Sequence, residues 1–380
     1  MKMRILDELK REMEELESEE KHDGYWYSIS EVLIILVCGM LCGLEKVVEI
    51  SSWSKSEPTR KFLKEYFGMT KIPCVSQFYN ILGCVDAESF NEAFKRWMSS
   101  VLSDGAKGKT VAIDGKTICS TDTLTPDGSV VHIASALVSE LNLVIGSEVC
   151  TTKTDEINAF RKLVKSLNVE GAVVVGDALH CRPKTAKAVV EAKADYLLVV
   201  KDNQESLKED LELYFQNEEV ETHQTMEKNG GRIETRTAYL SNDINWLDQK
   251  DKWEKLACIG AIHRQFEKDG HTSSEWHYYI SSGDLSAEEL LRHARMEWAV
   301  ESMHWLLDVH FKEDQTGIFD MNVQKVLNTA RKASLNMIRI FKDANCPKRI
   351  PLSGIMRNNL FDLDVLAQFL DFFSDSRLNP

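Results

Sequence analysis

The stretch GAVVVGDALHCRPK, residues 171–184, decides how the chain is interpreted. Its run of β-branched apolar residues is typical of a buried strand, and the run ends on Asp177, followed by a small residue and a histidine. In open α/β folds, ligands bind where such strands end. Asp177 is therefore a candidate for chemistry, and the alternative is that it only caps the next helix.

Strand and helix patterns alternate around this stretch. Short runs with the length and composition of strands are TVAIDGK at 110–116, SVVHIASALV at 129–138, LVIGSEVCT at 143–151, GAVVVGD at 171–177 and DYLLVVK at 195–201. Helical spacing appears in EINAFRKLVKSL at 156–167, PKTAKAVVEAK at 183–193 and NQESLKEDLELYF at 203–215. Three consecutive strands followed by alternating helices and strands predict an α/β fold, with a mixed sheet flanked by helices.

Residues 220–283 have a different rhythm, because GRIETRTAYL, KLACIGAIHRQFEK and EWHYYISS alternate as strands do. We interpret them as a β-rich insertion. Helical spacing resumes at Ser286, which can cap AEELLRHARMEWAVESMHWLLDVHF, with Glu289 at the capping-box position. The pattern predicts a helix over 287–311, and VLAQFLDFF near the C-terminus predicts a further short one.

Residues 29–100 read as helices. The apolar run VLIILVCGMLCGL at 32–44 is the only membrane candidate, but it is shorter than the roughly 20 residues that a bilayer requires, which favours a buried helix. Ser76 is expected to cap a later helix, and Lys71, Gln77 and Asn80 near its start make that helix a candidate for entering a DNA groove. A packing helix within an all-α domain is the alternative.

Composition narrows the class of protein. A hydrophobic content of 43% with 28% charged residues describes a globular protein, and the acidic N-terminus has no signal-peptide pattern. Nine cysteines without a C-x-x-C pair argue against a disulfide framework, and we expect a cytoplasmic protein without a membrane anchor. The net charge of −14 argues only weakly against nucleic acid, because phosphate contacts depend on local patches.

Two of the expected strands end on an aspartate. TVAIDGK places Asp114 before Gly115, as GAVVVGDALH places Asp177. If these strands are neighbours, two carboxylates converge at one point, and hard divalent cations prefer such oxygen ligands. A third ligand can come from the helix after the insertion, where acidic residues and a histidine recur at intervals of 4, 3 and 4: Glu297, Glu301, His304 and Asp308.

Two strand-end aspartates and a helix-borne glutamate would build a two-metal site for phosphodiester cleavage and transfer. The alternative for the helix is a solvated polar face. Simple phosphatases use similar ligands, so the carboxylates alone do not select the substrate.

The chain resembles the insertion-sequence transposases of the ISAs type, which include the H-repeat-associated proteins. The resemblance covers about residues 25–342 and is carried, in order, by YSISEVL near residue 27, AIDGK at 112–116, LNLVIG at 141–146, EIN at 156–158, GDALHC at 176–181, DYLLVVKDNQ at 195–204, DLELYF at 210–215, GRIETR at 231–236, YYISS at 278–282 and ESMHWLLDVHFKED at 301–314.

This resemblance implies a ribonuclease-H-like core whose DDE triad falls on Asp114, Asp177 and Glu301. It also implies two Mg²⁺ ions as cofactor, for which Mn²⁺ can substitute, and cleavage and strand transfer at the ends of an insertion sequence. The implied partners are double-stranded DNA, namely the terminal inverted repeats and the target, and a second copy of the chain in a homodimer. The implied location is the bacterial cytoplasm, in association with the nucleoid when the protein acts. We expect an N-terminal helical, DNA-binding domain at 1–104, the core at 105–219 and 284–342, the insertion at 220–283 and a helical tail at 343–380.

The chain departs from the family pattern at several positions, which are Glu297 where the family has His, Ser302 for Asn, Asp202 for Gly, Gly230 for His, and QTGIFDMNVQ at 315–324 where a basic stretch is usual. The loss of positive charge after Asp314 would weaken phosphate contacts. This loss puts the affinity for DNA in doubt more than the catalytic reaction.

Basic and aromatic residues in or near the matched motifs are candidates for positioning DNA, with a plain surface charge as the alternative for each: Lys116, Lys153, Lys201, Arg232 and Arg236. Trp298 could stack on an unpaired base, and core packing is its alternative. His132, His180 and His304 are candidates for hydrogen bonding near the ligands, although two-metal chemistry needs no protein base.

The sequence leaves three functions open. The first is an active DDE transposase. The second is a domesticated or decayed relative that binds DNA without transposing, favoured by the missing basic stretch. The third is a metal-dependent nuclease that cannot join strands.

Overall fold

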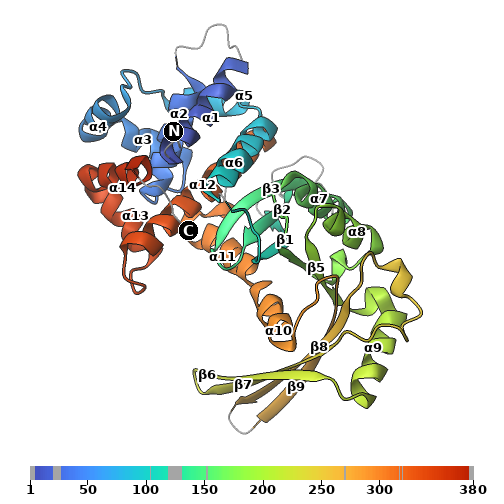
Figure 1. Cartoon of the computed structure of the whole chain (residues 1–380). Coiled ribbons are helices and arrows are strands. Elements are labelled where there is room, and N and C mark those ends of the chain that lie inside the picture. Colours follow the sequence, from blue (N-terminus) through green and yellow to red (C-terminus); the bar gives the residue numbers. More distant parts are fainter. Residues whose placement is uncertain are drawn as a thin grey trace.

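The computed structural model describes residues 5–19, 27–102, 104–118, 131–150, 153–268, 271–315, 317–318 and 320–375. An N-terminal group of helices comes first: α1 Ile5–Glu19, α2 Ile29–Leu41, α3 Val47–Lys55, α4 Glu57–Phe67, α5 Val75–Cys84 and α6 Ala87–Val101. Figure 1 shows this group packed beside a large sheet, together with the last helices of the chain.

The centre of the molecule is a mixed sheet. Its first five strands are β1 Thr110–Ile118, β2 Val131–Val138, β3 Leu143–Cys150, β4 Val173–Gly176 and β5 Asp195–Val200. They lie in the order β3-β2-β1-β4-β5, with β1, β2 and β3 antiparallel and β1, β4 and β5 parallel. This order and these directions are those of a ribonuclease-H-like core, which confirms the predicted fold class.

The insertion extends the same sheet. Its strands are β6 Glu221–Asn229, β7 Arg232–Ser241, β8 Cys258–Lys268 and β9 His271–Ser281, and β9 pairs antiparallel with β5 to give a nine-stranded sheet. The β6–β7 hairpin turns at Gly230 and Gly231, whose φ angles are 57° and 83°. A two-residue turn with two positive φ angles favours glycine, which accounts for Gly230 where the family has histidine.

Helices cover both faces of the sheet. One face carries α7 Lys153–Ser166, α8 Pro183–Glu191 and α9 Glu205–Asn217. The other carries α6, α10 Ala287–Met296, α11 Ala299–Phe311 and α12 Met321–Asn345. Side chains alternate between the faces, so Val111 and Ile113 of β1 join the core under α7, while Ala112 joins the core under α11 and α12.

The apolar run at 32–44 forms the buried helix α2. It contacts α1, α3 and α12, and its residues from Val32 to Leu41 are buried apart from Ile34. Helix α1, which carries the acidic N-terminal sequence, packs its apolar face of Leu6, Leu9, Met13 and Leu16 into the same core. None of the helices in the described ranges combines the length and the hydropathy that a membrane span requires.

The C-terminal segment completes the helical body. Helix α13 Leu352–Phe361 contacts α2 and α12, and α14 Leu363–Asp375 contacts α1 and α4. Helix α12 joins this body to the sheet through Asn336, which accepts a hydrogen bond from the Val144 N–H and donates to the Val144 carbonyl. The first and last parts of the chain therefore share one core.

Three local expectations need correction. Helix α5 begins at Val75 with Cys74 at the N-cap, so Ser76 lies inside the helix. Strand β1 continues to Ile118, so Asp114 is not at its end. The helix expected after the insertion is broken at residues 297–298 into α10 and α11, although Ser286 and Glu289 form the predicted capping box.

Candidate active site

Asp114 and Asp177 lie level with each other because of the strand register. In the parallel pair, Ala112 of β1 is opposite Val175 of β4. Asp114 comes two residues after Ala112 and Asp177 two residues after Val175, so the two aspartates are at the same level. Strand β4 ends at Gly176, which frees this edge of β1 at the level of Asp114. Asp177 caps a short 3-10 helix, because its Oδ1 accepts a hydrogen bond from the Leu179 N–H at 2.9 Å. Asp177 is therefore a helix cap, as the alternative interpretation proposed, and it also lines the cavity beside Asp114.

Glu301 reaches the same place from α11, which packs on β1 and β2. Asp114, Asp177 and Glu301 line one cavity of about 460 Å³. His304, one turn after Glu301, has Nδ1 at 3.7 Å from Oδ2 of Asp114. The structure thus brings together the three predicted carboxylates from three separate elements.

The break between α10 and α11 adds a fourth carboxylate. Glu297 is the C-cap of α10, and it lines the cavity with Glu301. Ser302 lies in the first turn of α11 and donates a hydrogen bond from its hydroxyl to the Trp298 carbonyl. Glu297, the acid that replaces the family histidine, therefore belongs to the cavity wall.

The crowding of acids raises two pKa values. Burial, with further contributions from Asp177, Glu156 and Glu301, raises the pKa of Asp114 to about 6. Burial, with Asp177 and Asp114, raises the pKa of Glu297 to about 7. A cavity that disfavours its own negative charge is one that a cation would stabilise.

The donors suit a hard divalent cation in kind, because carboxylate oxygens are the ligands that Mg²⁺ and Mn²⁺ prefer. Within the described ranges, no three histidine, cysteine or acidic side chains lie close enough together to share one ion. The carboxylates are thus distributed around the cavity wall and are not gathered at a single point.

The raised pKa of Glu297 predicts how stability of the metal-free chain varies with pH. The folded-state pKa of about 7 exceeds the ordinary value of 4.5, so protonation of Glu297 favours the folded state. This contribution to the free energy of unfolding is fully present below pH 4.5 and is lost as the pH rises through 7. In EDTA, the free energy of unfolding should fall between pH 5 and 8, and Glu297→Gln should make this fall smaller by on the order of 1 kcal/mol. Glu288→Gln, on the exposed side of α10, is the control, and an unchanged fall in Glu297→Gln would contradict the prediction.

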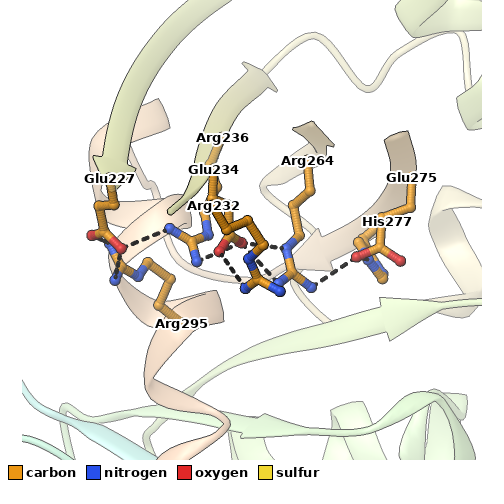
Figure 2. A network of polar contacts seen from close by, with 8 residues as sticks. All are labelled: Glu227, Arg232, Glu234, Arg236, Arg264, Glu275, His277 and Arg295. Carbon is orange, nitrogen blue, oxygen red and sulfur yellow. Dashed lines mark hydrogen bonds and ion pairs between the residues drawn. The ribbon is translucent and has the colours of Figure 1, made fainter. Parts of the chain in front are cut away.

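The wall of the cavity also contains cationic residues. Lys201, Arg236, Arg264 and Arg295 line the same cavity as the triad. Figure 2 shows that the three arginines belong to a chain of ion pairs across β6, β7, β8, β9 and α10, whose members are Glu227, Arg232, Glu234, Arg236, Arg264, Glu275, His277 and Arg295. The cavity is therefore lined by both acidic and basic side chains.

The ion pairs hold the arginines in place. The Glu227 carboxylate accepts hydrogen bonds from both Nη atoms of Arg295, at 2.6 and 3.1 Å, and from Nη1 of Arg236 at 3.1 Å. Glu234 is buried between Arg236 and Arg264, at 2.5 and 2.8 Å. Paired guanidinium groups lose little further freedom on binding an anion, which suits recognition of phosphate.

Trp298 lies at the wall of the cavity and is 52% exposed, so it is not a core residue. The Arg264 guanidinium lies over its ring at 4.6 Å from the centroid and also over Phe266 at 4.8 Å. This contact links the insertion to the start of the glutamate helix.

Lys116 does not face the cavity. Its ammonium pairs with Asp308, with Glu313 at 3.2 Å and with Asp314 at 3.4 Å, and its side chain is only 12% exposed. Asn328 of α12 also donates to Glu313, at 2.6 Å. The structure thus places Lys116 in a buried charge network that joins β1 to the segment after α11, which corrects the expectation of a DNA contact there.

The remaining candidates are dispersed. Lys201 is exposed at the cavity, while Arg232 pairs with Glu234 and lies over Phe266, 4.8 Å from its centroid. Lys153 begins α7, and its side chain lies outside the described residues. On α5, Asn80 is exposed and Gln77 half-buried, which leaves both interpretations of that helix open.

Sequence reasoning missed Arg264, Arg295 and Glu156. Arg264 is directly opposite Arg236 in the β7–β8 pair, so the alternation of strand residues could have placed it on the same face once the pairing was known. Nothing local marks Arg295, which reaches Glu227 from a different element.

The departures of the chain also have local explanations. Asp202 is exposed and pairs with Lys208 at 2.8 Å. Asp320, in the stretch that lacks basic residues, is the N-cap of α12 and accepts hydrogen bonds from the N–H groups of Asn322 and Val323. This acid therefore has a structural role.

The sheet order and the helices on its faces define an α/β protein with a ribonuclease-H-like core. Residues 106–337 match the family described as "Transposase DDE domain", and residues 11–98 match a domain described as "DDE_Tnp_1-associated". The chain belongs to the DDE transposase family.

Curated relatives over 93% of the chain agree with this membership. "Putative transposase YncI" of Escherichia coli O157:H7 is 29% identical over 366 residues, which cover 93% of each chain. "H repeat-associated putative transposase YhhI" of Escherichia coli K12 is 28% identical, over 93% of this chain and 97% of the relative. Among solved structures, a piggyBac transposase synaptic complex with hairpin DNA is similar at a TM-score of 0.44 and 13% identity, over 98% of this chain and 80% of that chain.

Proposed function

We propose that the chain cuts DNA at the ends of an insertion sequence and joins the freed ends to target DNA, with Asp114, Asp177 and Glu301 as the catalytic carboxylates. The observation that supports this most is the cavity that these three residues line together with three arginines. The carboxylates suit divalent cations, and the arginines suit a phosphodiester backbone.

Asp114, Asp177 and Glu301 would hold two Mg²⁺ ions, or Mn²⁺ in their place. When bound, such a pair lowers the pKa of an attacking hydroxyl and stabilises charge on the leaving oxygen. Glu297 adds an oxygen donor at the same wall. Arg236, Arg264 and Arg295 would neutralise phosphates of the strand being cut, and Trp298 would offer a ring to an unpaired base.

The reaction has two displacements at phosphorus. Water attacks the phosphodiester at the end of the element, the P–O3′ bond breaks, and the leaving oxygen takes a proton to become a 3′-hydroxyl. That hydroxyl then loses its proton and attacks a phosphodiester of the target, whose own 3′ oxygen leaves. The second step is a transesterification and needs no external energy source.

The N-terminal helices are proposed to bind the terminal inverted repeats, with the exposed side of α5 as the candidate surface. Two ends must be held together before joining, so we propose a homodimer as the active form. The sheet and α12 connect this helical body to the catalytic cavity.

The test is an excision and integration assay on a plasmid that carries the gene's own flanks around a marker. We expect the wild-type chain to mobilise the marker in Mg²⁺ and Asp114→Asn to be inactive. Cleaved flanks without joined products would indicate a nuclease that cannot transfer strands. Specific binding to the flanks without cleavage would indicate a relative that has lost transposition, the alternative that the segment after Asp314 favours.

A further inference from the structure

Two glycines adjoin the aspartates and project to the opposite face of the sheet. Gly115 follows Asp114 on β1, and Gly176 precedes Asp177 at the end of β4. A Cβ at Gly115 would lie 2.4 Å from the carboxyl carbon of Glu156, and one at Gly176 would lie 2.7 Å from the Phe160 ring. Because glycine has no side chain, Glu156 and Phe160 of α7 can pack against the sheet directly behind the two aspartates.

Glu156 and His180 occupy this space. Nε2 of His180 lies 3.4 Å from Oε1 of Glu156 and 3.7 Å from Oδ1 of Asp177. The imidazole stacks on Phe160 with centroids 4.3 Å apart, which restricts the plane of its ring. His180 is 1% exposed and Glu156 is 8% exposed, so both are withdrawn from water.

The imidazole of His180 has no hydrogen-bond partner at either nitrogen in the part of the chain that the structure describes. Leaving a buried polar group without a partner costs free energy, and such groups call for an explanation. Since Nε2 lies at 3.4 and 3.7 Å from an oxygen of each of two carboxylates, a small movement of those carboxylates would supply the missing partner.

Helix geometry alone does not explain Glu156. An acidic residue in the first turn of α7 is favoured by the helix dipole, and Asp155 beside it meets that preference as well. The dipole does not require the carboxylate to be buried over Gly115. Its position at the back of Asp114 therefore points to the site.

We propose that Glu156 and His180 are positioning residues for the two aspartates. Glu156 keeps the imidazole proton on Nε2, and the Nε2–H group then holds Oδ1 of Asp177 when the aspartates close on cations. This inference rests on the proposed function, because it assigns the pair to the support of metal-binding carboxylates. Partners of this kind change metal affinity by about 10- to 100-fold when they are removed.

The test measures Mn²⁺ affinity of the full-length chain by electron paramagnetic resonance, without DNA. His180→Phe keeps the ring and its stack on Phe160 but removes both nitrogens, whereas His180→Gln keeps a donor near the Nε2 position. Glu156→Gln removes the charge. Gly115→Ala displaces the Glu156 carboxylate, which is the end of a flexible side chain and can move at little cost to folding.

Matched controls separate the effect from general damage. Gly354→Ala lies in α13, where the nearest atom to a new Cβ is at 3.5 Å, and Glu191→Gln removes a surface carboxylate of α8. Asp177→Asn shows how far the Mn²⁺ affinity falls when a proposed metal ligand is lost. Thermal unfolding of each variant in EDTA shows whether it is folded before the titration.

We expect Glu156→Gln, His180→Phe and Gly115→Ala to weaken Mn²⁺ binding by about tenfold or more, and His180→Gln to restore most of it. Wild-type affinity in folded Glu156→Gln and His180→Phe, with binding lost in Asp177→Asn, would overturn the positioning role and leave the metal site standing. Absence of Mn²⁺ binding in the wild type would refute the metal site itself, and the positioning role with it.

Discussion

Replacing Asp177 with Asn should abolish strand cleavage while the chain stays folded and continues to bind DNA. Asn retains the Oδ1 acceptor that caps the 3-10 helix through the Leu179 N–H, so the local structure is kept. The substitution removes the charge that we propose as a metal ligand. A loss of about 4 kcal/mol of transition-state stabilisation corresponds to roughly a 10³-fold slower reaction.

The measurement is cleavage of a labelled duplex that carries the gene's own flanks, in Mg²⁺ and in Mn²⁺, together with binding by fluorescence anisotropy. Asp86→Asn is a matched control, because Asp86 caps α6 in the same way, accepting from the Glu88 N–H at 2.9 Å, and lies outside the cavity. Cleavage at the wild-type rate in Asp177→Asn would refute the site. Loss of binding together with cleavage would indicate instead that the residue grips DNA.

Replacing Lys116 with Met should destabilise the protein by on the order of 3 kcal/mol, because it leaves buried acids without their cation. Lys116 pairs with Asp308, Glu313 and Asp314, and it is a principal cause of the lowered pKa of the fully buried Glu313. Met preserves the length of the side chain, so the loss reports the charge. Arg331 and Lys332 also interact with the charge of Glu313. They still compensate part of that charge in the variant, which limits the loss of stability.

Urea unfolding of the two proteins measures this difference. Lys187→Met is the control, since Lys187 is a surface lysine that forms a long i,i+4 pair with Glu191 at 3.9 Å, and it should change stability by less than about 0.5 kcal/mol. If Lys116 were a phosphate contact, the variant would instead keep its stability and show a flatter dependence of DNA binding on salt. That result would return Lys116 to the DNA surface.

Local patterns were sufficient for much of the fold. The β-branched runs at 110–116 and 171–177 form β1 and β4, and the Ser286 capping box starts α10 as predicted. Such signals are local because a strand or a cap depends on neighbours a few residues away. The register of two parallel strands was not predicted, yet the matching Asp positions in both runs anticipated that the carboxylates would meet.

The break at residues 297–298 was not visible in the sequence. The spacing of Glu297 and Glu301 suits a continuous helix, and no proline or glycine marks an interruption. The break follows from the way α10 packs on the insertion strands while α11 packs on β1 and β2. A packing requirement between distant elements overrode the local periodicity.

The sequence by itself determined the order of strands and helices, the family, and the three carboxylates proposed for catalysis. Only the tertiary structure decided that Lys116 is buried among acids, that Arg236, Arg264 and Arg295 line the same cavity as the triad, and that Glu156 and His180 lie behind the aspartates. The physical reason is that a strand or a helix is specified by residues close in sequence. The partner of a charged side chain is specified by register and packing between segments far apart in the chain.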